Sequence, residues 1–315
     1  MINDFSILIP AYNVDHYIEK CLNSIINQTY KKFEVVIIDD GSTDKTFSII
    51  EKFKQKDKRI RVYRQSNSGI IYTRNRLLDL ANGKWLVFID ADDYIKENYL
   101  ACFIEYIRKN NKADVFVCDY VRWESGNVFK TYKKPFHDKL EYLTQLLDWR
   151  CTNTALWAKI IKKDLVASCK IRFEVGIVLG EDLCFMSRLF YYSNEIVYIP
   201  EDNYIWNRTN AFSITNSRNN QLDYILLYET IADFYIKKSD YRLFSKYLNN
   251  TMVMVIETLY LNCGSLSFGK LPVLIDKKQL TLLNKLKFYL IQHDFYKIEL
   301  LVEKISRRLK RMING

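Results

Sequence analysis

Three closely spaced carboxylates at the end of an apolar segment are the clearest candidates for chemistry in this 315-residue chain. Asp90, Asp92 and Asp93 directly follow the apolar run 85–89, and Ala91 separates the first two. Neighbouring carboxylates repel one another unless they are solvated or bind a cation, and hard divalent cations prefer oxygen ligands. The Asp-x-Asp spacing therefore predicts a site for Mn²⁺ or Mg²⁺ carrying a diphosphate. The alternative is a solvated turn in which Asp92 or Asp93 caps a helix that begins near Tyr94.

The elements around this cluster alternate between strand and helix patterns, which indicates an α/β fold. A second acidic pair, Asp39-Asp40, follows the apolar run 35–38. Uninterrupted apolar runs are typical of parallel strands covered on both faces, so we expect a mostly parallel sheet flanked by helices. The expected strands are 5–10, 33–38, 60–63 and 84–89, and the expected helices are 16–27, one from about 43, and 69–81. Ligands bind at the carboxyl ends of such strands, so both acidic clusters should line one crevice.

The rest of the chain is less regular. Residues 114–123 and 128–132 predict a hairpin, residues 137–149 predict an amphipathic helix, and an irregular stretch follows to Gly180. From about residue 219 the pattern is helical, with no internal repeat and no low-complexity linker. We expect a first domain over residues 1–217, divided near 112/113, and a helical subdomain over residues 218–315.

Composition limits the partners without choosing among them. The net charge of +10 favours nucleic acid, an anionic membrane or a phosphorylated substrate. Seven scattered cysteines without a C-x-x-C pair predict reduced thiols and a cytoplasmic protein. The apolar stretches are shorter than the roughly 20 residues that a membrane-spanning helix needs.

The residues after successive strands together suit a nucleoside diphosphate. Pro10, Tyr12 and Asn13 follow the first strand, Asp39-Asp40 the second, and Arg74 lies in the helix before the fourth. An aromatic face, a carboxylate that accepts from an imide N–H, and a guanidinium would accompany the acidic cluster. No glycine-rich dinucleotide fingerprint and no G-x-x-x-x-G-K-[ST] loop is present, so the sequence supports neither an NAD site nor a P-loop site.

Residues 5–94 resemble the inverting, nucleotide-sugar-dependent glycosyltransferase family 2, which has the GT-A fold. The resemblance resumes at Trp157, Lys159 and residues 180–185. It implies that residues 1–112 bind the nucleotide-sugar and residues 113–217 the acceptor. The implied roles of single residues are these: Tyr12 stacks near uracil, Asp40 reads the base, Arg74 lies near the nucleotide, Asp90 contacts ribose or metal-bound water, and Asp92 ligates the cation.

Glu181-Asp182 resembles the E-D motif of the same family, in which the aspartate serves as the general base. An acceptor hydroxyl must lose its proton as it attacks the anomeric carbon, and a positioned carboxylate contributes roughly 10²- to 10⁴-fold to such a step. We therefore expect Asp182 to be the catalytic base beside Glu181. The alternative is that either residue only caps the helix 183–192. By the same resemblance, Arg208 lies in a segment over the donor and would help to neutralise the diphosphate.

These expectations combine into one predicted function, the inverting transfer of a sugar from a UDP-sugar to a hydroxyl of a growing glycan. Lipid-linked and protein-linked acceptors both remain open. The basic C-terminal segment 298–311 predicts a helix that either lies on the inner face of the plasma membrane or packs on the protein. The alternative functions are a sugar-phosphate nucleotidyltransferase and a non-catalytic nucleotide-sugar or nucleic-acid binding protein. Acidic clusters at strand ends would repel nucleic acid, and no glycine-rich basic loop follows the first strand. The donor sugar, the linkage and the oligomeric state stay open.

Overall fold

A computed structural model describes most of the first two thirds of the chain and part of the rest. The described residues are 3–124, 126–131, 136, 138–147, 154–177, 180–210, 222–240, 243–245, 247–249 and 253. The chain divides into two compact units, Met1–Arg218 and Asn219–Gly315. In the second unit, helix α8 (Leu222–Lys237) buries Leu227, Ile231 and Tyr235 on one face. The division of the first unit near 112/113 stays a prediction, and the basic segment 298–311 lies outside the described residues.

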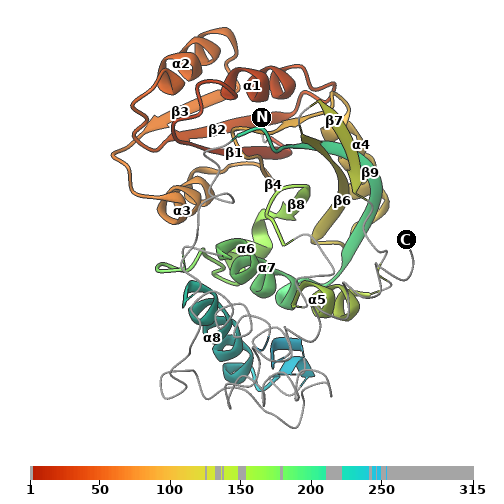
Figure 1. The fold of residues 1–315 in the computed structure, drawn as a ribbon. Helices are drawn as coiled ribbons and strands as arrows, with labels where there is room; N and C mark the ends of the chain where they lie inside the picture. The colour runs from red at the N-terminus through yellow and green to blue at the C-terminus, as the bar shows by residue number, and fades with distance from the viewer. Residues whose placement is uncertain are drawn as a thin grey trace, which may run out of the picture. The chain divides into compact units, whose positions relative to one another are not determined.

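The first half of unit 1 has the predicted parallel strands. The order is β3-β2-β1-β4, formed by β1 (Phe5–Ala11), β2 (Phe33–Asp39), β3 (Ile60–Arg64) and β4 (Trp85–Phe88). Three helices alternate with them: α1 (Ile18–Ile26), α2 (Thr46–Lys56) and α3 (Ile70–Leu80). Figure 1 shows α1 and α2 on one side of these strands and α3 on the other. Every residue of β2 is buried, as expected for a strand covered on both faces.

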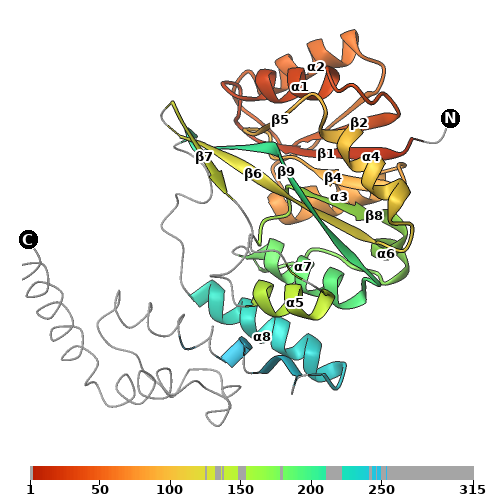
Figure 2. The ribbon, with the colours of Figure 1, turned by 90° about the vertical axis from the view of Figure 1, so that its right-hand side faces the viewer.

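The second half of the sheet makes it mixed. Beyond β4 lie β8 (Lys159–Lys162), β6 (Val115–Glu124), β9 (Ile196–Asn207) and β5 (Tyr94–Ile95), and β7 (Asn127–Thr131) pairs with β6. Among the described strands, four pairs are parallel and four are antiparallel. The sheet is therefore parallel from β3 to β4 and mixed beyond β4, where β6 and β9 are parallel, and the predicted hairpin is present as β6 and β7. Figure 2 shows β6 and β9 running side by side.

One local prediction in this half is wrong and one alternative is excluded, and both concern short elements. The strand β8 lies in the stretch predicted to be irregular, because its four residues are too few to show a periodic pattern. No helix begins near Tyr94: Tyr94 and Ile95 instead pair with β9 as the short strand β5. Among the described residues of unit 1 lie four further helices: α4 (Tyr99–Lys109), α5 (Lys139–Leu147), α6 (Lys163–Ser168) and α7 (Glu181–Tyr192). None of the described helices has the length and apolar character needed to cross a bilayer.

Candidate active site

The loops after β1 and β2 are fastened to each other at the carboxyl edge of the sheet. The backbone N–H of Asn13 donates to Oγ of Ser42 at 3.0 Å, and the N–H of Thr43 donates to Oδ1 of Asn13 at 2.9 Å. Asn13 has a left-handed φ of 49°, a conformation that asparagine tolerates better than most residues. Pro10 lies within β1, and the side chain of Tyr12 is 47% exposed beyond its end. The two predicted motifs, one after β1 and one after β2, therefore lie side by side at this edge of the sheet.

The two carboxylates after β2 face different partners. Asp40 accepts three hydrogen bonds, from Nε2 of Gln65 at 2.7 Å and from the backbone N–H groups of Ser68 and Gly69 at 2.9 Å each. A carboxylate offers about four acceptor positions, so Asp40 keeps about one for a ligand. Asp39 is fully buried, and its Oδ2 lies 3.0 Å from Nε of Arg64. Asp40 therefore orders the loop that begins α3, whereas Asp39 faces the protein interior.

The acidic turn after β4 is tied to the end of β9. Asp93 points inward, where it accepts from the hydroxyl of Tyr204 at 2.6 Å and from the N–H of Asn207 at 2.8 Å. Oδ2 of Asp92 accepts from Nδ2 of Asn210 at 2.9 Å. Ala91, which separates Asp90 from Asp92 in the sequence, is buried, whereas the side chain of Asp90 is partly exposed. Neither Asp92 nor Asp93 caps a helix, because the chain continues into β5.

Arg74 joins this turn to the start of α7. The guanidinium is buried, with Nη1 2.7 Å from Oε1 of Glu181 and 2.6 Å from Oδ1 of Asp182. Its Nη2 lies 3.5 Å from Oδ1 of Asp90. The ring of Phe173 lies below the guanidinium, 5.5 Å from its central carbon. Two acidic clusters separated by about ninety residues of sequence therefore meet at the guanidinium of Arg74.

The second carboxylate oxygen of Asp182 also accepts a hydrogen bond. Oδ2 accepts from the backbone N–H of Leu156 at 3.0 Å. Gly180 adopts a left-handed φ of 74° immediately before α7, and no side-chain cap hydrogen bond is formed at this helix start. Glu181 and Asp182 thus occupy the first turn of α7, where the helix dipole favours negative charge, and their side chains point toward Arg74 rather than capping the helix.

The cluster carries more negative charge than Arg74 can balance. Burial, helped by the charges of Asp92 and Asp182 and opposed by Arg74, raises the pKa of Asp90 from 3.8 to about 7. Burial and the neighbouring Asp182 likewise raise the pKa of Glu181 to about 7. Burial also raises the pKa values of Asp92 and Asp93. Such raised values mark carboxylates that lack enough positive charge nearby, which is the environment that a divalent cation would relieve.

The donor set suits a cation that brings other ligands with it. Within the described ranges, no three His, Cys, Asp or Glu side chains converge as a complete metal cage. The acidic turn can supply oxygen ligands from Asp92 and Asp90, and Mg²⁺ in particular is usually bound by one or two carboxylates with waters and substrate phosphates. The residues therefore fit a cation bound together with a diphosphate.

The segment that contains Arg208 contacts the acidic turn through its neighbours Asn207 and Asn210. The guanidinium of Arg208 itself lies over the ring of Trp206 at 5.0 Å, and its role at the diphosphate stays a prediction. Sequence reasoning missed Tyr204, Asn207 and Asn210 as partners of Asp92 and Asp93, and it missed Leu156 as a partner of Asp182. Each of these contacts joins residues far apart in the chain, so no local spacing could have indicated it.

Comparison with known proteins decides the family. The family model described as glycosyl transferase family 2 matches residues 6–171, more than half of the chain. The chain belongs to glycosyl transferase family 2. It is 31% identical to Glycosyltransferase GlyA of Streptococcus pneumoniae over 212 residues, which are 64% of this chain and 30% of GlyA. It is 26% identical to the putative glycosyltransferase EpsH of Bacillus subtilis over 268 residues, 82% of this chain and 76% of EpsH.

A solved relative of this family confirms the fold. The structure of Staphylococcus aureus TarS 1–349 in complex with UDP-GlcNAc aligns with a TM-score of 0.77 at 21% identity, covering 97% of this chain and 92% of that one. The predicted GT-A fold is thereby confirmed. The chain spans less than a third of the length of GlyA.

Proposed function

We propose that this chain transfers a sugar from a UDP-sugar to a hydroxyl of a glycan, with inversion at the anomeric carbon. The observation that carries the proposal is the convergence of Asp90 and Asp182 on the single guanidinium of Arg74. One carboxylate comes from the turn at the carboxyl end of β4, where open α/β sheets bind their ligands. The other comes from the first turn of α7. The donor and the attacking hydroxyl would therefore meet between them.

Asp182 is proposed as the general base. Its Oδ1 is held by Arg74 and its Oδ2 by the N–H of Leu156, so the carboxylate is fixed while each oxygen keeps acceptor capacity. A carboxylate held in this way can accept a proton from an incoming hydroxyl. The proton would move from the acceptor oxygen to Asp182 as the new glycosidic bond forms and the nucleoside diphosphate departs.

The nucleotide half of the donor would lie over the loops after β1 and β2. Tyr12 offers an exposed ring there, and Asp40 keeps acceptor capacity beyond its three internal hydrogen bonds. A divalent cation, when bound at Asp92 and Asp90, supplies Lewis-acid stabilisation of the charge on the leaving diphosphate. Asn210 now donates to Asp92, so this amide would share or yield that oxygen when the diphosphate binds.

UDP-GlcNAc is the first donor to test, because the neighbouring TarS structure holds that compound. The curated TarS of S. aureus, 29% identical over 64% of this chain, is named a poly(ribitol-phosphate) beta-N-acetylglucosaminyltransferase. The membership of family 2 argues against the nucleotidyltransferase and nucleic-acid alternatives. The cytoplasmic location and the contact of segment 298–311 with an anionic membrane remain predictions.

A nucleotide-release assay over a panel of UDP-, GDP- and dTDP-sugars tests the proposal. We expect turnover of one or more UDP-sugars with Mn²⁺ or Mg²⁺, and loss of turnover when the cation is removed with EDTA. Turnover that is unchanged by EDTA would remove the cation role of Asp92. An absence of turnover and of UDP binding across the whole panel would contradict the proposed function.

A further inference from the structure

A fully buried lysine lies close to the proposed base. Lys159, the first residue of β8, has no exposed surface, and its ammonium donates to the backbone carbonyl of Ala155 and, at 3.4 Å, to that of Trp157. Lysine is almost never fully buried in proteins, because removing its charge from water costs free energy that polar partners must offset.

One peptide group connects Lys159 to Asp182. The carbonyl of the peptide between Ala155 and Leu156 accepts from the ammonium, and the N–H of the same peptide donates to Oδ2 of Asp182 at 3.0 Å. The cation and the carboxylate therefore lie at opposite ends of a single peptide dipole. Hydrogen bonds in series polarise one another, so a cation at the carbonyl strengthens donation by the N–H.

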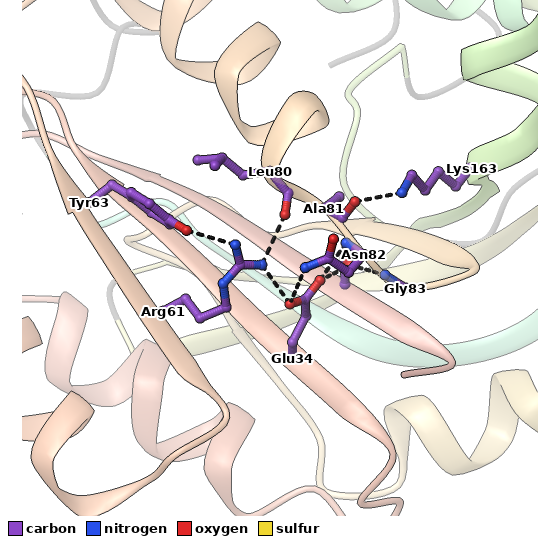
Figure 3. A network of polar contacts seen from close by, with 9 residues as sticks. Glu34, Arg61, Tyr63, Leu80, Ala81, Asn82, Gly83 and Lys163 are labelled. Atoms are coloured by element: carbon purple, nitrogen blue, oxygen red, sulfur yellow. Dashed lines mark hydrogen bonds and ion pairs between the residues drawn. The ribbon is translucent and has the colours of Figure 1, made fainter. Parts of the chain in front are cut away.

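The same arrangement occurs a second time, away from the candidate site. Lys163 donates to the carbonyl of Ala81 at 2.6 Å, and the N–H of the next residue, Asn82, donates to Oε1 of Glu34 at 2.6 Å. Figure 3 shows this chain of contacts beside Arg61. Glu34 lies near the amino end of β2, whereas the site lies at the carboxyl ends of the strands.

The Glu34 arrangement shows what such a peptide does to a carboxylate. Burial by itself would raise the pKa of Glu34, yet the hydrogen bonds from Ser6, from the N–H of Asn82 and from Arg61 outweigh it and lower the pKa. The N–H of a peptide whose carbonyl binds a lysine is thus one of the groups that keep this buried carboxylate ionised.

We propose that Lys159 is a positioning residue that acts on Asp182 through the peptide between Ala155 and Leu156. It fixes the plane of that peptide, so that the N–H points at Oδ2, and it strengthens this hydrogen bond. The role assigned to Lys159 rests on the proposed function, because it matters for turnover only if Asp182 takes the proton. The physical link between Lys159 and Asp182 does not depend on turnover.

A double-mutant cycle in urea unfolding tests the link without any substrate. The variants are Lys159→Met, Asp182→Asn and the two combined. We expect Lys159→Met to lower the unfolding midpoint in the wild-type background and to lower it by less than half as much beside Asp182→Asn, because a neutral amide gains little from a strengthened donor. Equal losses in the two backgrounds would overturn the proposal. If Lys159→Met does not fold, Lys159→Gln takes its place, since it keeps an N–H donor for the carbonyls without the charge.

Kinetics then separate a positioning role from a general loss of structure. We expect Lys159→Met to lower kcat by about tenfold or more while the Kd for UDP changes by less than about threefold, because donor binding does not use Asp182. Lys163→Met is the matched control: it should couple to Glu34→Gln in urea and leave kcat within about twofold of wild type. If kcat falls equally in Lys159→Met and Lys163→Met, the positioning role is wrong. If wild type turns over no donor, the proposed function fails while the urea cycle still decides the link.

Discussion

Nη1 of Arg74 lies 2.6 Å from Oδ1 of Asp182, although the two residues are 108 positions apart in the chain. Arg74 lies in α3 and Asp182 in the first turn of α7, so this contact joins the two halves of unit 1. The same guanidinium reaches Glu181 and Asp90. Burial by itself would lower the pKa of Arg74, but the charges of Asp182, Glu181 and Asp90 outweigh it and raise this pKa further, so the guanidinium stays charged at any working pH. The arrangement of these acidic groups depends on the guanidinium of Arg74.

Removing the guanidinium of Arg74 should destabilise the fold. Arg74→Met leaves Asp90, Glu181 and Asp182 together without a guanidinium, and breaking a buried ion pair in this way costs about 3–5 kcal/mol. Arg74→Lys keeps the charge but cannot reach two carboxylates at once, so we expect an intermediate loss. Urea unfolding at pH 8 measures both variants. A loss below about 1 kcal/mol for Arg74→Met would contradict the arrangement.

The raised pKa of Asp90 predicts a pH-dependent effect on stability. Folding raises this pKa from 3.8 to about 7, so the folded chain holds the proton more tightly than the unfolded chain. The stabilising contribution is complete below pH 4 and is lost as the pH rises toward 7. Asp90→Asn should therefore gain stability relative to wild type between pH 4.5 and pH 8, by on the order of 1 kcal/mol after allowing for solvent screening. A relative stability that is constant over this range in urea unfolding would contradict the raised pKa.

Tyr204 provides a test of the inward-facing carboxylate. Tyr204→Phe removes the hydroxyl that donates to Asp93 at 2.6 Å but keeps the ring, which stacks on Trp157 with centroids 4.9 Å apart. An acceptor left without its donor in a buried position costs about 1–3 kcal/mol. Thermal unfolding of this variant should show that loss. Tyr17→Phe, which loses a hydroxyl contact near the surface at 3.3 Å, is the control and should remain close to wild type.

The two acidic residues of α7 should differ in importance. Asp182→Asn should lower the rate of sugar transfer by about 10²- to 10⁴-fold because it removes the proposed base, while UDP binding measured by calorimetry is retained. Glu181→Gln should cost less than about tenfold, because Glu181 contacts Arg74 but accepts no proton in the proposed step. A larger loss for Glu181→Gln than for Asp182→Asn would transfer the role of base to Glu181, whose pKa of about 7 already suits that task.

The sequence predicted the elements whose patterns are long. Buried strands such as Val35–Ile38 and amphipathic helices such as α1 have several consecutive apolar positions to indicate them. The acidic turn after β4 was found by residue type and spacing, and the pair Glu181-Asp182 by its resemblance to the E-D motif of the family. The four-residue strand β8 and the two-residue strand β5 were missed, because elements this short depend on pairing with distant strands.

The partners of the site residues were harder to predict than the residues themselves. Asn210 is 118 positions from Asp92, and Leu156 is 26 positions from Asp182, so neither contact follows from a local period. Arg74 was predicted to lie near the nucleotide, but its contacts with Glu181 and Asp182 could not be predicted from the sequence. Such contacts depend on how the two halves of the sheet pack, which only the folded structure defines.

Proton NMR of the sugar released from UDP-GlcNAc tests the central claim most directly. A single displacement assisted by Asp182, with water as the acceptor, converts the α-linked donor into the β anomer of the free sugar before mutarotation. We predict early formation of the β anomer by wild type with Mn²⁺ and none above background for Asp182→Asn. If a UDP-sugar other than UDP-GlcNAc is the donor in the panel, the same experiment applies to it. Early release of the α anomer, or equal rates for wild type and Asp182→Asn, would contradict the account.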